Sequence, residues 1–444
     1  MNTSEPNRDL ARLYRETGWT LRQFAQAVNR LGTERGSPLK YREPSVHQWL
    51  NGGLPRQETR ALVLEALARK LGRPVTHSEV GFPALPTTSE GATGTVDGII
   101  DLGTQDMNRR NLMGAALFTV ALSVPNWPDV VGRMERTRTS ATQSIGMSDV
   151  QMVIDMTERV SDLDDEFGGR TARPMAATFL VNHVAPYLRA DGPTEARKAM
   201  MAAASDLCYL TGYMAVDEGL HGLAQQYYRK ALELAGAAED HLTYCTTLRG
   251  MSVQAVDLRH GNSAMNLANA AAAASPNAGP RMRAFLAGQQ AHAAALTGDR
   301  SKALRHIREA EAAMEQAENR GKPFGSYDPS SLNYHISQVR YELGDLVGSV
   351  EAMEQSDQLR FGVYRRARVR HRATLAERQL ALGHLEAACH TWTTALEEWP
   401  LIKSGRADDR MRTMVKMIRP YTKNAYAGSL YERARTVLPS DMYV

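Results

Sequence analysis

An internal repeat constrains the fold of this 444-residue chain more than any other feature of the sequence. Five glycines each lie between two runs of helix-forming residues, at intervals of 42, 37, 46 and 39 residues: Gly219, Gly261, Gly298, Gly344 and Gly383. Strand patterns are scarce from about Arg109 to the C-terminus, where Ala, Leu, Met and Gln recur at helical spacing. The chain is therefore expected to be all-α, with helix pairs joined by glycine-containing turns.

The helix after each glycine carries a small, a large and a small residue at spacings of four and three. Ala224, Tyr228 and Ala231 show the pattern, and four of the five repeats contain it. The repeat after Gly261 departs from it, with Asn266, Ala270 and Ala273 at the three positions. Since such positions share one helix face, the pattern predicts close packing against the preceding helix.

This repeat resembles the tetratricopeptide repeat, and Gly212, twelve residues before Ala224, fits the glycine of that family's first helix. The resemblance implies an α-solenoid over 109–444, with about five to seven helix pairs. Weaker pairs are expected between Asp149 and Ser205, and the run Tyr421 to Leu438 is expected to cap the array. The spacings exceed the family's usual length, so longer helices or loops are expected, and another α-solenoid class stays open.

The concave groove of such a solenoid is expected to bind a peptide or a small molecule. The expected groove residues are polar side chains on the first helices of the pairs: Tyr213, Gln254, Asp257, Gln289, Asn333, Ser337 and Arg340.

The N-terminal region has the pattern of a helix-turn-helix. Thr20 and Gln23 have the spacing of a capping box, which predicts a helix starting at Thr20. A second helix is expected from near Glu43 to Asn51-Gly52-Gly53, flanked by helices over 8–17 and 57–71. Ala25 is expected where the two central helices approach most closely.

The outward positions of this motif carry residue types that contact DNA. Val46, Trp49 and Leu50 are expected in the core, so Arg42, Ser45, His47 and Gln48 point outward, with Gln23 on the preceding helix. Residues 1–75 contain thirteen Lys/Arg and seven Asp/Glu, whereas the whole chain has a net charge of only +4. The expected phosphate contacts are Arg22, Arg30, Lys40 and Arg56.

Residues 8–75 resemble an Xre-type helix-turn-helix of the lambda-repressor-like class. The resemblance rests on Phe24-Ala25, Val46, Trp49 and Asn51-Gly52, and it implies double-stranded DNA as a partner. Leu21 stands where this family often has a DNA-contacting Gln, and the loop expected over 31–41 is longer than usual.

The domain boundaries follow from composition. The stretch 76–108 is rich in Pro, Gly, Ser and Thr and is expected to link a DNA-binding domain over 1–75 to the solenoid. The next run, 108–123, starts with two arginines, as a twin-arginine signal does. Its apolar part is too short to span a bilayer, so we expect a buried helix and no membrane partner.

No catalytic, cofactor or metal motif is recognised. HExxH, GxSxG, Walker A and strand-linked GxGxxG patterns are missing, and an enzyme is not expected. Cys208, Cys245 and Cys389 lack metal-ligand spacing and suit the reducing cytosol. The acidic run 162–166 and the arginine-rich run 360–372 are both expected to be solvated helix faces.

A helix-turn-helix domain followed by a tetratricopeptide-like domain resembles the domain arrangement of two groups of bacterial regulators. These are peptide-responsive quorum-sensing regulators and actinobacterial regulators of the NsdA type. The resemblance implies a cytoplasmic, homodimeric transcription regulator tuned by a ligand, with no cofactor. The alternative is a protein-interaction scaffold that sequesters a partner and carries a vestigial head that does not bind DNA.

Overall fold

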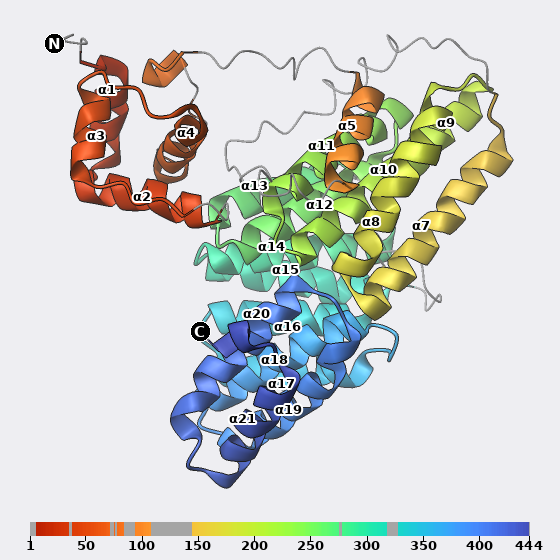
Figure 1. Ribbon diagram of the computed structural model, residues 1–444. Helices are drawn as coiled ribbons and strands as arrows, with labels where there is room; N and C mark the ends of the chain where they lie inside the picture. The colour runs from red at the N-terminus through yellow and green to blue at the C-terminus, as the bar shows by residue number, and fades with distance from the viewer. Residues whose placement is uncertain are drawn as a thin grey trace.

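A computed structural model describes residues 6–34, 38–71, 75, 78–83, 94–107, 144–274, 278–317 and 327–443. These residues form helices and contain no strand, apart from one isolated bridge between Ser144 and Asp191. The all-α expectation is confirmed (Figure 1). The buried helix expected over 108–123 lies outside the described residues.

The N-terminal unit is a cluster of four α-helices with one short 3-10 helix. Its elements are α1 (Arg8–Thr17), α2 (Leu21–Glu34), α3 (Glu43–Leu50), α4 (Gln57–Leu71) and η1 (Ser78–Val80). The capping box forms as predicted, since the Thr20 amide donates to Gln23 Oε1 at 2.9 Å and the Gln23 amide donates to Thr20 Oγ1 at 3.3 Å.

Two expectations for this unit need correction. The loop expected over 31–41 is too long, because α2 continues to Glu34 and buries Leu31 in the core. The stretch 76–108, expected to be a linker, contains η1 and α5 (Thr95–Met107). Val80 and Phe82 are buried in the core of the N-terminal unit, whereas Ile99 of α5 belongs to the core of the repeat body.

The repeat body consists of five helix pairs preceded and followed by further helices (Figure 1). The pairs are α10 (Thr194–Asp217) with α11 (His221–Ala238), α12 (His241–Asp257) with α13 (Gly261–Ala274), α14 (Pro280–Leu296) with α15 (Arg300–Glu315), α16 (Pro329–Glu342) with α17 (Leu346–Leu359), and α18 (Arg365–Ala381) with α19 (Leu385–Glu398).

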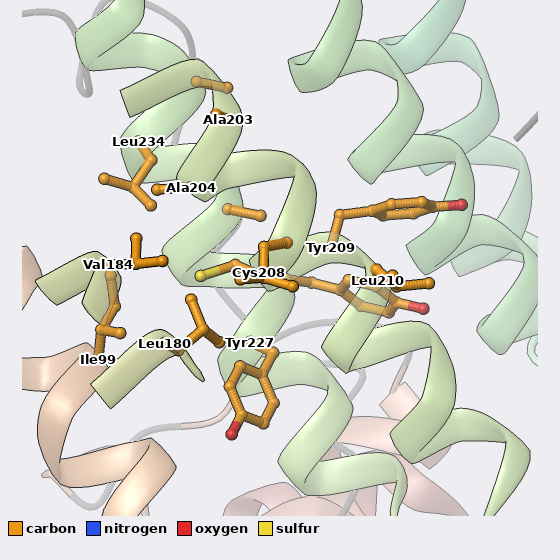
Figure 2. Packing of buried hydrophobic residues seen from close by; sticks show 14 of the residues in the cluster. Ile99, Leu180, Val184, Ala203, Ala204, Cys208, Tyr209, Leu210, Tyr227 and Leu234 are labelled. Carbon is orange, nitrogen blue, oxygen red and sulfur yellow. The ribbon is translucent and has the colours of Figure 1, made fainter. Parts of the chain in front are cut away.

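Other helices cover both ends of this array. Those before the first pair are α5, α7 (Met147–Phe167), α8 (Gly169–Phe179), the π-helical turn η4 (Leu180–Val184) and α9 (Ala185–Arg189). Those after the last pair are η5 (Trp399–Leu401), α20 (Gly405–Ile418), η6 (Arg419–Tyr421), α21 (Ala425–Val437) and η7 (Ser440–Tyr443). Figure 2 shows how Ile99 of α5 and Leu180 of η4 face Cys208 of α10 in the largest core.

The turn inside each pair has one residue with positive φ, which sets the register of the repeat. Four of these residues are the expected glycines, but in the second pair the residue is Arg259, with φ of 64°, and not Gly261. Counted from Arg259, the small residues of that repeat are Ala264 and Ala271, which are fully buried. The small positions of this repeat were therefore misplaced by two residues, because a non-glycine residue holds the left-handed position. The middle position is Ala268, so the repeat still lacks the large side chain of the pattern, as expected.

Small side chains let the two helices of each pair approach closely. Each pair has two buried small residues at fixed distances from the turn residue. One lies seven positions before the turn residue and the other five positions after it, as Gly212 and Ala224 do. In two pairs a serine adds a hydrogen bond across this contact. Ser252 Oγ donates to the Ala264 carbonyl at 2.7 Å, and Ser337 Oγ donates to the Ser349 carbonyl at 2.6 Å.

The array curves until its last part contacts its first part. The Lys403 amide, after the fifth pair, donates to the Phe167 carbonyl at the end of α7 at 2.7 Å. Ser404 Oγ donates to Asp217 Oδ1 at 2.9 Å. These contacts, together with those between α7 and α18, partly close the concave face that the first helices of the pairs form.

Candidate functional site

The aromatic core of the N-terminal unit fixes the position of α3. Trp49 of α3 is 4% exposed and contacts Phe24 of α2 edge to face, with ring centroids 6.4 Å apart. Tyr41, just before α3, contacts the other side of Trp49 at 5.0 Å. Val46 and Ala25 are also buried in this core, as expected from the sequence. One face of α3 is thereby held against α2, and the opposite face is exposed.

The turn between α2 and α3 is fixed by one side chain that the sequence analysis missed. Asn29 Nδ2 donates to the Tyr41 carbonyl, and the Tyr41 amide donates to Asn29 Oδ1, both at 2.8 Å. This pair of bonds holds the end of the long turn on α2. A polar Asn next to the apolar face of α2 could have indicated a buried hydrogen bond. Its partner, Tyr41, lies twelve residues further along the chain, so the sequence did not identify it.

The expected DNA-contacting residues lie mostly on the surface of this unit. Ser45 is half-buried, and the other eight are exposed: Arg22, Gln23, Arg30, Lys40, Arg42, His47, Gln48 and Arg56. Gln23 Oε1 is occupied by the cap of α2, and His47 contacts the Asn51 side chain at 3.0 Å. None of the five Arg and Lys residues has a carboxylate within 4.0 Å in the part of the chain that the structure describes.

The repeat body contains a cavity of about 360 Å³ on its concave face. Its walls come from α7 and from the first helices of the five pairs, α10, α12, α14, α16 and α18, with the residues just before α16 and α18. Aromatic rings form much of the lining: Tyr209, Tyr213, Phe285, Tyr327, Tyr334 and Tyr364. The cavity thus lies where a solenoid is expected to bind a ligand.

A buried ion-pair cluster closes one side of the cavity. Arg366 of α18 pairs with Asp164 and Asp165 of α7 at 2.9 and 3.1 Å, and with Asp217 of α10 at 3.5 Å. Burial raises the pKa of Asp164 to about 7 despite its contact with Arg366. Burial alone would raise the pKa of Tyr213, but Arg366 and Arg406 lower it to about 8. The cluster joins the start of the array to its last pair.

These charges correct two expectations from the sequence. The runs 162–166 and 360–372 are not simply solvated faces, because Asp164 and Arg366 are 2% and 6% exposed. The available signal was the spacing from buried apolar residues: Asp164 lies four residues after Val160, and Arg366 lies three before Val369, so each charge shares a helix face with a core residue. The repeat alone did not show that α7 and α18 meet.

The expected groove residues divide into two sets. Tyr213, Asp257 and Gln289 line the cavity. Gln254, Asn333, Ser337 and Arg340 do not; their side chains bond to His221 O, Pro329 O, Ser349 O and Gly348 O. Gln254, Ser337 and Arg340 therefore hold the backbone of the neighbouring helix, and Asn333 bonds within its own helix.

None of the helices in the described residues is both long and apolar enough to cross a membrane. Within the same ranges, no group of three or more His, Cys, Asp or Glu side chains is arranged to hold a metal ion. The three cysteines are free and buried.

Residues 10–83 match the family model described as SP15 N-terminal domain. The matched range ends just after Phe82, the last residue in the core of the N-terminal unit, so it includes η1 as well as α1 to α4. No curated protein matches the chain. The family model therefore coincides with the compact N-terminal unit and leaves the repeat body unmatched.

Proposed function

We propose that this protein is a DNA-binding transcription regulator whose repeat body responds to a ligand. The observation that carries the proposal is the exposed face of α3, where Arg42, His47 and Gln48 project from a helix anchored by its opposite face. Arg, Gln and His can donate hydrogen bonds to base edges in the major groove. In the proposed complex, α3 lies in that groove.

Exposed cations around α3 support the same function. Arg22 and Arg30 on α2, Lys40 in the turn and Arg56 before α4 have no carboxylate within ion-pair distance in the described ranges. Elsewhere on this unit, Arg12 pairs with Glu16 at 3.1 Å and Arg69 pairs with Glu65 at 2.8 Å. Unpaired cations release counterions when they contact phosphates, so they favour DNA over a neutral protein partner.

The coupling between the two parts is also proposed. The contacts that close the array, such as Arg366 with Asp164, join helices that are far apart in the sequence. A ligand in the cavity would touch both sides of that closure and shift it by its differential affinity for the closed and open forms. In a homodimer formed through the repeat body, this shift would alter the distance between two DNA-binding heads.

The DNA-binding test uses the full-length chain and its selected target sequence. Fragments are selected from a random duplex pool, and affinity is measured over a salt series. Gln48→Ala is expected to lose preference at one base pair, at a cost of about 1–3 kcal/mol. Arg22→Ala is expected to weaken all sequences alike and to reduce the salt slope by about one.

Arg12→Ala serves as the matched control, because Arg12 is an exposed arginine of the same unit that is already paired with Glu16. It should leave the target affinity within about twofold of wild type, since an exposed ion pair contributes little. If no duplex is enriched, or if the Gln48 and Arg22 variants behave alike on every sequence, the proposed role of α3 is wrong. The scaffold function would then be the better account of the chain.

A further inference from the structure

The cavity contains cationic side chains that the closing ion-pair cluster does not neutralise. Arg249 of α12, Arg360 after α17 and Arg370 of α18 line it, and none has a carboxylate within 4.0 Å among residues 144–274, 278–317 and 327–443. Among the acidic residues of the lining, Asp164 and Asp165 of α7 pair with Arg366, and Asp257 of α12 pairs with Arg406 at 3.0 Å. The lining also contains Glu158 and Asp162 of α7. The positive charge of the lining is therefore concentrated on the walls formed by the repeat helices, whereas the wall formed by α7 is acidic.

Hydrogen-bond donors in the cavity also lack partners. Arg249 Nε and Arg360 Nε are buried and have no acceptor in the described structure. His371 is 5% exposed, and its Nδ1 has no partner there either. Arg370 contacts His371 Nε2 at 3.3 Å, and because a guanidinium only donates, Nε2 is the acceptor. The proton of the neutral ring is then on Nδ1, which becomes a third free donor.

Aromatic faces adjoin these donors. The Tyr334 ring stacks on His371 with centroids 4.2 Å apart, and Arg370 lies 5.9 Å from the Tyr334 ring centre. The Arg249 guanidinium lies 3.4 Å from the centre of the Phe285 ring. Two acceptors of the lining, Gln289 Oε1 and Asp164 Oδ1, are buried without a hydrogen-bond partner in the part of the body described. The lining suits a molecule that is flat and apolar in part and carries a group that accepts several hydrogen bonds.

We propose that this cavity binds a small organic anion, with a carboxylate or phosphate group at Arg360, Arg370 and His371 and a planar ring among the tyrosines. Charge-assisted hydrogen bonds from guanidinium groups to such anions are among the strongest that proteins form. A volume of about 360 Å³ lies near the lower end of the ~300–1,000 Å³ range of small-molecule sites. The size favours a compact molecule over an extended peptide.

This inference specifies the ligand of the proposed regulator, but its test does not require DNA. Binding to the full-length protein is measured by calorimetry with four probes of similar shape: 1-naphthoate, 1-naphthyl phosphate, the neutral 1-naphthamide and the cationic 1-naphthylmethylamine. At least one anion is expected to bind about tenfold or more tightly than the amide, and the amine is expected to bind most weakly. Comparing the two anions distinguishes a carboxylate site from a phosphate site.

Variants then locate the anion. Arg360→Gln and Arg370→Gln are each expected to remove most of the preference for the anion over the amide, while Arg370→Lys keeps part of it. Arg365→Gln is the matched control, because Arg365 is on α18 and faces Glu166 at 4.0 Å but does not line the cavity. It should leave the preference unchanged.

The comparison of probes on the wild-type protein keeps the test decisive even where a variant does not fold. Equal or weaker binding of both anions relative to the amide would overturn the proposal. So would a preference for anions that survives in folded Arg360→Gln and Arg370→Gln proteins. DNA binding by the head would stand in either case, because it is measured separately.

Discussion

Replacement of Gly212 by Ala tests whether close helix approach holds the repeat pairs together. Gly212 lies on α10 where it crosses α11, and an added Cβ would lie 2.9 Å from two ring carbons of Tyr228 and 3.2 Å from the Ala224 carbonyl oxygen. Tyr228 is fully buried and stacks on Tyr209 at 5.9 Å, so its ring has little room to move. Helix propensity and packing therefore predict opposite effects of this substitution.

The sizes of these two free-energy effects decide whether Gly212→Ala stabilises or destabilises the pair. Overpacking a filled core costs about 1–3 kcal/mol. Alanine gains about 1 kcal/mol over glycine inside a helix. Since the new contacts are with a fixed ring and a backbone oxygen, we expect the upper half of the packing range, and a net loss of about 1–2 kcal/mol in the stability of the α10–α11 pair.

Native-state hydrogen exchange of the α10 and α11 amides is the appropriate assay, because a repeat array need not unfold in one step. A double-mutant cycle with Tyr228→Leu identifies the cause: without the ring, the cost of Gly212→Ala should fall or reverse. Increased protection in Gly212→Ala with Tyr228 in place would refute the argument from close approach.

Two further predictions concern single side chains. Asn29→Ala removes both hydrogen bonds to Tyr41 and should lower the free energy of unfolding of the N-terminal unit by about 1–3 kcal/mol. It should also weaken DNA binding without changing the slope of affinity against salt. Hydrogen exchange of the α2 and α3 amides checks the first result, and a salt series of DNA affinities checks the second. Burial, with nearby Asp240, raises the pKa of Asp206 to about 7, so the folded protein keeps this proton after the unfolded chain has lost it. Wild-type stability should therefore fall by about 1.4 kcal/mol per pH unit between about pH 4 and 7, relative to Asp206→Asn. Parallel unfolding of the two proteins at pH 4 and pH 8 checks this, and an equal difference at both values would contradict it.

The sequence by itself determined the local features of this protein. The Thr20–Gln23 cap, the bounds of the N-terminal helices other than the end of α2, and the small-large-small pattern depend on residues a few positions apart. Their physics is short-range, because capping and helix periodicity involve neighbours within one or two turns. For the same reason, the sequence indicated which face of α3 is exposed.

The register of the second repeat shows where local reasoning fails. Glycine is the usual residue at positive φ, so the sequence predicts Gly261 as the turn residue. In the structure, Arg259 has the positive φ of this turn. The two helices that flank the turn fix its geometry, and their packing makes the cost at Arg259 tolerable. The Asn29 contact with Tyr41 was missed for a related reason, since its partner is across a turn of unknown path.

Only the tertiary structure showed that Asp164 and Arg366 meet beside the cavity, although Tyr213, Asp257 and Gln289 of its lining were expected from the sequence. Asp164 and Arg366 are about two hundred residues apart, and each belongs to a charged run that resembles a solvated surface. Whether they meet depends on the curvature of the whole array, which is the sum of small rotations between successive pairs. No single repeat encodes that sum. The exposed face of α3 could therefore be predicted from neighbouring residues, while the meeting of α7 with α18 at the cavity required the path of the entire chain.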